Sequence, residues 1–199
     1  MMDYVKEAKA KYLKVRNGID DDTKNLTEFF AFCYLWYRPN EYGKKIQKKL
    51  EDYFGLVKVS EKDQKGDSFL NFMDKLKLWF EIKVSYLGNT DSFTIRHIRK
   101  WQNFDYYLLC FINPLEDFKV RYIVVTCDDL TNNFRCNFMN GTKESNLVNQ
   151  NASLGVTIKK DSKDYNLLLE LNKLNGTDAI HMFEFLSEKK YGLNIKTAA

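Results

Sequence analysis

The chain has 199 residues and a formal net charge of +4, with 44% hydrophobic and 15% aromatic residues. This length and composition exclude extended disorder and favour one folded domain with a substantial core. No run of about 18 apolar residues is present, which excludes a membrane-spanning helix. The first residues also lack the apolar block of a secretory signal, so we expect a cytoplasmic protein. The mild positive charge favours a polyanionic partner.

The N-terminal part of the chain is predicted to be helical. Helices are expected at residues 3–16, 26–37 and 40–54. The second is rich in aromatic residues, and Pro39 is predicted to end it because proline interrupts helical hydrogen bonding. In the third, apolar side chains recur every four residues, and Gly55 supplies a stop signal. Residues 1–55 therefore form a predicted helical part.

Three strands are predicted next. Residues 56–60 suit a short strand, and residues 69–73 suit a strand or a turn. The pattern is clearest at residues 76–86, where apolar side chains alternate with others, so that successive side chains point to opposite faces. The alternation places Glu81 and Lys83 side by side on the face away from the apolar one.

A basic helix is predicted after the Gly88-Asn89 break, with Asp91 or Ser92 as its cap. The spacing places one set of apolar residues on one side of this helix: Ile95, Ile98 and Trp101. A basic set lies on the other side: Arg96, Arg99 and Lys100.

The remaining elements complete an α/β pattern. Residues 106–112 are almost continuously apolar, as expected for a strand covered on both faces, and residues 121–126 form its expected neighbour. A polar segment at residues 128–163 follows, then a strand or helix at 165–171 and an amphipathic helix at 178–190. We therefore predict a single domain with a mixed central sheet flanked by helices.

An aspartate upstream of a Glu-x-Lys strand points to metal-assisted chemistry. Carboxylate oxygens of Asp67 and Glu81 are hard ligands of the kind that Mg²⁺ prefers. Lys83 beside them can stabilise an attacking hydroxide or contact a phosphate, so the set suggests hydrolysis of a phosphodiester. The alternative is a solvent-facing ion pair between Glu81 and Lys83, which is common on sheets.

The order of these elements resembles the common core of the PD-(D/E)xK nuclease superfamily, and within it a type II restriction endonuclease. The resemblance covers roughly residues 40–112. It rests on the helix at 42–51, on Gly66-Asp67, on Glu81-Ile82-Lys83, and on the basic segment 96–101 that runs into 105–109.

The resemblance implies roles for the residues that match. Asp67, Glu81 and Lys83 are the expected catalytic residues. The first two are expected to hold Mg²⁺ together with the main-chain carbonyl of Ile82. Some members of the superfamily add a glutamate from the preceding helix; Glu41 and Glu51 are the candidates, and we favour Glu51.

Two groups of residues are candidates for contact with DNA. Phosphate contacts are expected from Arg96, Arg99 and Lys100, and His97 between them is interpreted as a phosphate contact or a surface residue in preference to a base. Side chains that pair with base edges are concentrated in the 128–163 segment: Asn133, Arg135, Asn137 and Lys143. The alternative for this segment is an ordinary polar loop.

The sequence therefore predicts a Mg²⁺-dependent, site-specific endonuclease that cleaves double-stranded DNA, expected to act as a homodimer because cutting both strands of a palindrome usually takes two copies. The predicted organisation is one nuclease domain, 1–199, with a catalytic core at 56–127, a candidate DNA-recognition insertion at 128–163 and C-terminal elements at 164–199. Two alternatives stay open: a structure-selective nuclease of the same superfamily, such as a junction resolvase or repair nickase, and a non-catalytic DNA-binding protein. No signature of a nucleotide hydrolase, dehydrogenase, serine hydrolase or zinc protease is present.

Overall fold

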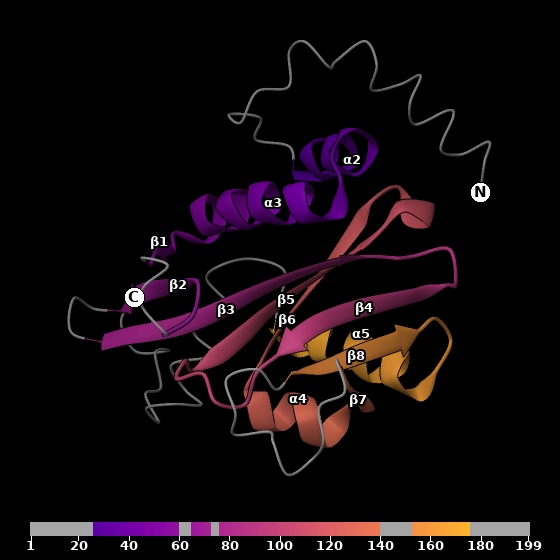
Figure 1. Ribbon diagram of the computed structural model, residues 1–199. Helices are drawn as coiled ribbons and strands as arrows, with labels where there is room; N and C mark the ends of the chain where they lie inside the picture. Colours follow the sequence, from indigo (N-terminus) through magenta and orange to yellow (C-terminus); the bar gives the residue numbers. More distant parts are fainter. Residues whose placement is uncertain (1–25, 60–64, 73–75, 140–152, 176–199) are drawn as a thin grey trace.

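The computed structural model of the protein (Figure 1) describes residues 26–59, 65–72, 76–139 and 153–175. The helices predicted at 3–16 and 178–190, and Lys143, lie outside the described residues. No helix in these residues is both long and apolar enough to cross a membrane.

The centre of the fold is a five-stranded mixed sheet. Its strands are β1 (Val57–Lys58), β2 (Ser68–Phe72), β3 (Leu76–Tyr86), β5 (Tyr106–Asn113) and β6 (Lys119–Val125), in the order β1-β2-β3-β5-β6. The β3–β5 pair is parallel and the other pairs are antiparallel. The predicted fold class is therefore confirmed, and β3 has the predicted bounds.

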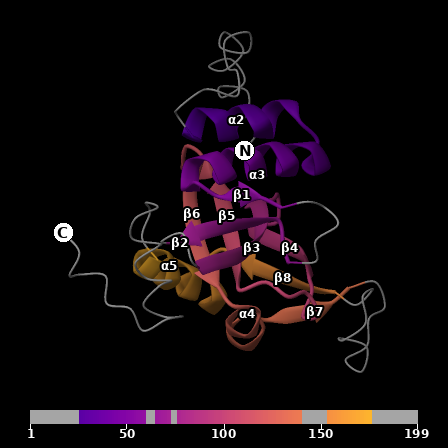
Figure 2. The same cartoon turned by 90° about the vertical axis from the view of Figure 1, so that its left-hand side faces the viewer.

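Two helices, α2 (Leu26–Trp36) and α3 (Pro39–Phe54), cover one face of this sheet (Figure 2). Apolar side chains of α3 such as Ile46 and Leu50 are fully buried against the sheet, as their spacing predicts. The helix predicted at 26–37 is α2, which ends at Trp36, before Pro39. Pro39 is the first residue of α3, where its missing N–H is tolerated because the first N–H groups of a helix have no partner within the helix.

The opposite face of the sheet is covered by a second, three-stranded sheet and two helices (Figures 1 and 2). Its strands are β4 (Ser92–Ile98), β8 (Leu154–Lys159) and β7 (Cys136–Phe138), in the order β4-β8-β7, and the helices are α4 (Cys127–Asn133) and α5 (Lys163–Asn175). All eight residues of β5 are buried because both faces of the strand are covered, which explains its continuous apolar sequence. A short 3₁₀ helix, η1 (Pro114–Glu116), joins β5 to β6.

The prediction of a basic helix after Gly88-Asn89 is wrong, because this segment forms the strand β4. Phe93 and Ile95 are buried and Thr94 is exposed, which is the alternation of a strand. A β-bulge then inserts one extra residue between Ile95 and Ile98, so that Ile98 returns to the buried face after three residues instead of two. Apolar residues three positions apart are also typical of a helix, which is why the sequence pattern predicted one here.

The polar segment at 128–163 also contains more regular structure than its composition indicates. The described part of it holds most of α4, with β7 and β8, and Val156 and Ile158 of β8 are buried in the second core cluster. The segment at 165–171, predicted as strand or helix, belongs to α5.

Candidate active site

The candidate site lies along a stretch of β3 that has a strand partner on one side only. β2 pairs with β3 at residues 76–80, whereas β5 pairs with it at residues 80–86. Among the described residues, positions 81–86 of β3 therefore have no strand partner on the β2 side. Two cavities of about 670 and 830 Å³ lie beside this free edge, between α3 and the segment that contains β4.

Asp67 is held at the start of this free edge by three hydrogen bonds. Its N–H donates to the carbonyl of Phe80 (2.8 Å), and its own carbonyl accepts from the N–H of Val59 (2.9 Å). Its carboxylate Oδ2 accepts from the N–H of Ile82 (2.8 Å). The last bond places a carboxylate directly beside the Glu-x-Lys stretch of β3.

Gly66 allows the close approach that brings Asp67 to β3. Its φ of 99° is in the region that favours glycine, and an added Cβ would lie 2.6 Å from the carbonyl oxygen of Phe80. That oxygen accepts the N–H of Asp67, so it cannot move away without breaking the bond.

Gly66→Ala is therefore expected to lower the free energy of unfolding by roughly 2 kcal/mol or more. The matched control is Gly43→Ala in α3, where an added Cβ meets nothing within 4 Å and alanine is the better helix former. Urea unfolding of both variants tests this, and equal stability of the two would contradict the role given to Gly66.

Glu81 and Lys83 form a direct ion pair, with 2.5 Å between Lys83 Nζ and Glu81 Oε1. The side chains are only 6% and 22% exposed, respectively, so the pair is not the solvent-facing one considered as an alternative. Glu81 lines the smaller cavity and Lys83 lines the larger. The pair therefore stands where the two cavities meet, one residue to either side of Ile82.

The groups around Asp67 shift the pKa of its carboxyl group in opposite directions. Burial, and next the negative charge of Glu81, raise the pKa of Asp67 to about 6. The hydrogen bond from Ile82 and the charge of Lys83 act in the other direction and offset this only in part. Two carboxylates that repel each other inside a cavity are a favourable place for a divalent cation, which removes the repulsion.

A magnesium ion is compatible with these groups, although within the described residues no cluster of three or more Asp, Glu, His or Cys side chains could hold a metal. Mg²⁺ commonly binds through one or two carboxylates and takes its other ligands from water and substrate phosphates. The main-chain carbonyl of Ile82 is a further candidate. In a strand the N–H and C=O of one residue point to the same side, so this carbonyl faces the side on which Asp67 receives the N–H.

Glu51 is near the site, but the structure gives it different partners. It is 5% exposed, and its Oε1 accepts hydrogen bonds from Ser68 Oγ (2.5 Å) and Gln47 Nε2 (3.1 Å). It adds only the smallest of the effects that raise the pKa of Asp67. Its described environment is that of a residue that anchors the start of β2 to α3, and direct metal binding by Glu51 stays a prediction.

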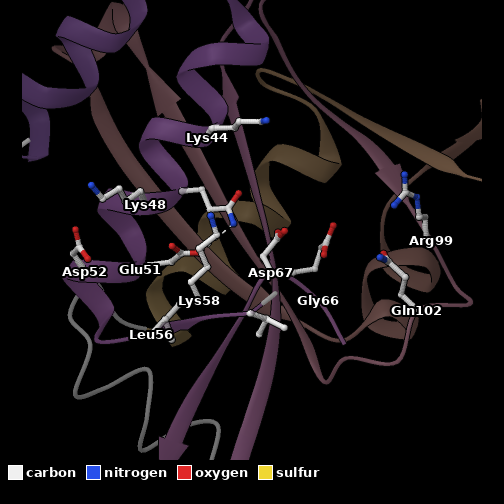
Figure 3. Close-up of a pocket in the computed structure, with 13 residues that line it drawn as sticks. Lys44, Lys48, Glu51, Asp52, Leu56, Lys58, Gly66, Asp67, Arg99 and Gln102 are labelled. Carbon is white, nitrogen blue, oxygen red and sulfur yellow. Dashed lines mark hydrogen bonds between the residues drawn. The ribbon is translucent and has the colours of Figure 1, made fainter. Parts of the chain in front are cut away.

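The smaller cavity has basic walls around its acidic centre. Lys44, Lys48 and Glu51 come from α3, Arg99 and Gln102 come from the segment after β4, and Asp67 lies between them (Figure 3). The main chain of Arg99 is fixed to the core, because the main-chain N–H of Arg99 donates to the hydroxyl of the buried Tyr107 (3.0 Å). An anionic chain can therefore meet cations on both sides of the carboxylates.

The other predicted DNA contacts are dispersed. Arg96 lines the larger cavity, whereas Lys100 is exposed and lines neither. Asn133 donates from Nδ2 to the carbonyl of Asp129 within α4, and Arg135 and Asn137 are exposed at and beside β7. These last three lie away from both cavities, and their role as base-reading residues stays a prediction.

Sequence reasoning missed Gln47 and Gln102. Both line the smaller cavity, and Gln102 Oε1 is buried there without a hydrogen-bond partner. The helical period of 40–54 could have placed Gln47 beside Glu51, because residues four apart share a face. Nothing in the local sequence indicates that the loop after β4 folds back to face Asp67.

Comparison with known proteins gives no further assignment: the chain matches no protein-family model and is similar to no curated protein.

Proposed function

We propose that this protein is a Mg²⁺-dependent endonuclease that cleaves double-stranded DNA at specific sites, related to the type II restriction enzymes of the PD-(D/E)xK superfamily. The observation that carries the proposal is the position of Asp67, whose carboxylate accepts the N–H of Ile82 between Glu81 and Lys83. Two carboxylates and one ammonium group thereby meet at one strand edge, beside two neighbouring cavities with cationic walls.

Each residue has a defined task in this proposal. Asp67 and Glu81 hold the cation, with the Ile82 carbonyl on the same side of β3. Bound magnesium supplies positive charge for the phosphate oxygens and lowers the pKa of a coordinated water. Lys83 Nζ, already directed at the carboxylate of Glu81, orients the attacking water. The water oxygen bonds to phosphorus and releases one proton to solvent, one ester P–O bond breaks, and the leaving oxygen takes up one proton from solvent.

A duplex is the proposed substrate because cations stand on both walls of the site, from α3 on one side and from Arg96 and Arg99 on the other. We further propose that two copies of the chain cut the two strands of a palindromic site, and that the protein works in the cytoplasm. Site specificity is assigned to the predicted base-reading residues of the 128–163 segment: Asn133, Arg135, Asn137 and Lys143.

Incubation of purified protein with plasmid and bacteriophage DNA, in Mg²⁺ and in EDTA, tests this function. Discrete fragments that require Mg²⁺ are expected. A smear or nicked circles would contradict site-specific cleavage and indicate a structure-selective or non-specific nuclease. Intact DNA under all conditions, together with equal DNA binding in Mg²⁺ and EDTA, would contradict catalysis and favour a non-catalytic DNA-binding protein.

A further inference from the structure

The larger of the two cavities differs from the smaller in the charge of its walls. Four side chains with a basic nitrogen line the larger cavity: Lys44, Lys83, Arg96 and His97. None of its described lining residues is Asp or Glu. The smaller cavity, in contrast, contains the carboxylates of the candidate metal site. A space with several cationic donors, several hydroxyl groups and no carboxylate suits a phosphodiester group.

The two cavities are neighbours along one track. Lys44 and Gln47 of α3 line both of them. The free edge of β3 passes from Glu81 in the smaller cavity to Ile82 and Lys83 in the larger. A strand of nucleic acid with one phosphate at the carboxylates would therefore place a neighbouring phosphate in the larger cavity.

The β-bulge of β4 turns two consecutive side chains toward this cavity. Ile95 pairs with Val156 and Ile98 pairs with Leu154, so Arg96 and His97 together face a single residue of β8. In a regular strand two consecutive side chains would point to opposite faces. Here both are exposed and both line the larger cavity, because the extra residue redirects one of them.

His97 is held in this position at a conformational cost. Its φ is 60°, in the left-handed region that favours glycine. Four other described residues apart from glycine have positive φ, and none of them lines either cavity: Asp91, Asp117, Phe118 and Asp161. Strained backbone conformations of this kind concentrate at sites where the side chain is needed.

The imidazole can act as a neutral donor at this position. Partial desolvation of the exposed imidazole, followed by the charges of Arg99, Lys83 and Arg96, lowers the pKa of His97 below its ordinary value. An uncharged imidazole still carries one ring N–H that can donate to a phosphate oxygen.

We propose that the larger cavity is a phosphate subsite for the nucleic-acid strand next to the cleaved bond, in which Arg96 and His97 of the β4 bulge donate to one phosphate group. This inference rests on the proposed nuclease function and adds to it the path of the strand beyond the metal site. A contact to phosphate positions the strand without reading its sequence.

Binding of two short fluorescent DNA duplexes of unrelated sequence, measured by anisotropy in EDTA, tests the proposal. His97→Gly is expected to weaken binding of both duplexes by about tenfold or more, the effect of one hydrogen bond to a charged group. His97→Asn keeps an N–H donor and tolerates positive φ, so it is expected to retain most of the affinity. Asp161→Gly, the matched control at φ 63° outside the cavities, is expected to bind like wild type.

Glycine fits the bulge better than histidine, so His97→Gly is expected to melt no lower than wild type, and a loss of binding cannot then be ascribed to unfolding. Equal binding by wild type and His97→Gly, or a loss seen with only one duplex, would overturn the phosphate subsite. Wild-type protein that binds both duplexes in EDTA but cleaves no DNA in Mg²⁺ would overturn the nuclease function and leave the subsite in place. Failure of wild type to bind either duplex in EDTA would overturn the phosphate subsite, whereas the nuclease function is decided separately by cleavage in Mg²⁺.

Discussion

Replacing Lys83 by alanine is expected to lower the rate of DNA cleavage by about a thousandfold or more. The ammonium group of Lys83 lies 2.5 Å from Glu81 in a largely enclosed position, and a charged group at such a place typically contributes this much when it acts on a transition state. The change removes no apolar packing of the core, so we expect the folded structure to persist. Single-turnover cleavage in Mg²⁺ is the measurement.

Lys77→Ala is the matched control for this experiment. Lys77 belongs to the same strand and is exposed, and its Nζ lies over the ring of Phe69 at 4.5 Å from the centroid. Its removal is expected to leave the cleavage rate within about twofold of wild type, as for a surface residue away from the chemistry. Similar losses for the two lysine variants would show that the effect of Lys83 is not specific to the site.

Asp67→Asn is expected to make the protein more stable and inactive at once. At pH 8 in EDTA the free energy of unfolding should rise by roughly 1–3 kcal/mol, because the variant removes a buried negative charge that Glu81 repels. The amide oxygen of asparagine can still accept the N–H of Ile82. Urea unfolding of the variant and of wild type gives the difference.

The sign of the pH dependence follows from the raised pKa of Asp67. An unfolded aspartate ionises near pH 3.8, whereas the folded one ionises near pH 6. The folded state therefore binds the proton more tightly, and its stability falls as the pH rises from about 4 to about 6. The advantage of Asp67→Asn should be complete above this range and absent below it. An advantage that does not change with pH, or a less stable variant at pH 8, would contradict the charge repulsion assigned to the site.

The central strands could be predicted because their local pattern and their tertiary environment agree. The alternation at residues 76–86 gave β3 its bounds, since one face packs under α3 and the other carries Glu81 and Lys83. The continuous apolar run of β5 reflects burial on both faces of the sheet. In both strands the residues of the segment itself carry the pattern of apolar side chains that its position in the sheet requires.

The segment after β3 could not be predicted in this way. The extra residue between Ile95 and Ile98 changes the apolar spacing from two to three, which local periodicity assigns to a helix. The pairing of β4 with β8, a strand some sixty positions later in the chain, decides the structure. The positions of Arg96 and His97 therefore depend on a long-range contact that the local sequence does not contain.

The candidate site was partly predictable for a similar reason. Asp67, Glu81 and Lys83 lie on neighbouring elements, and the Glu-x-Lys spacing placed two of them on one face. The environment of Glu51 depends on Ser68 and on the packing of α3, and the wall formed by Gln102 depends on the return of the loop after β4. These features arise from tertiary packing, so residue types and spacing did not reveal them.

The binding of a divalent cation by Asp67 and Glu81 is the central claim, and paramagnetic broadening tests it most directly. Mn²⁺ shares the preference of Mg²⁺ for carboxylate and water ligands and broadens amide NMR signals near its binding site. Titration of ¹⁵N-labelled wild type with Mn²⁺ should broaden the amides of residues 66–68 and 80–83 first, and Mg²⁺ should compete. Glu81→Gln should lose this response. Broadening elsewhere in the protein, or an unchanged response in Glu81→Gln, would contradict the proposed site.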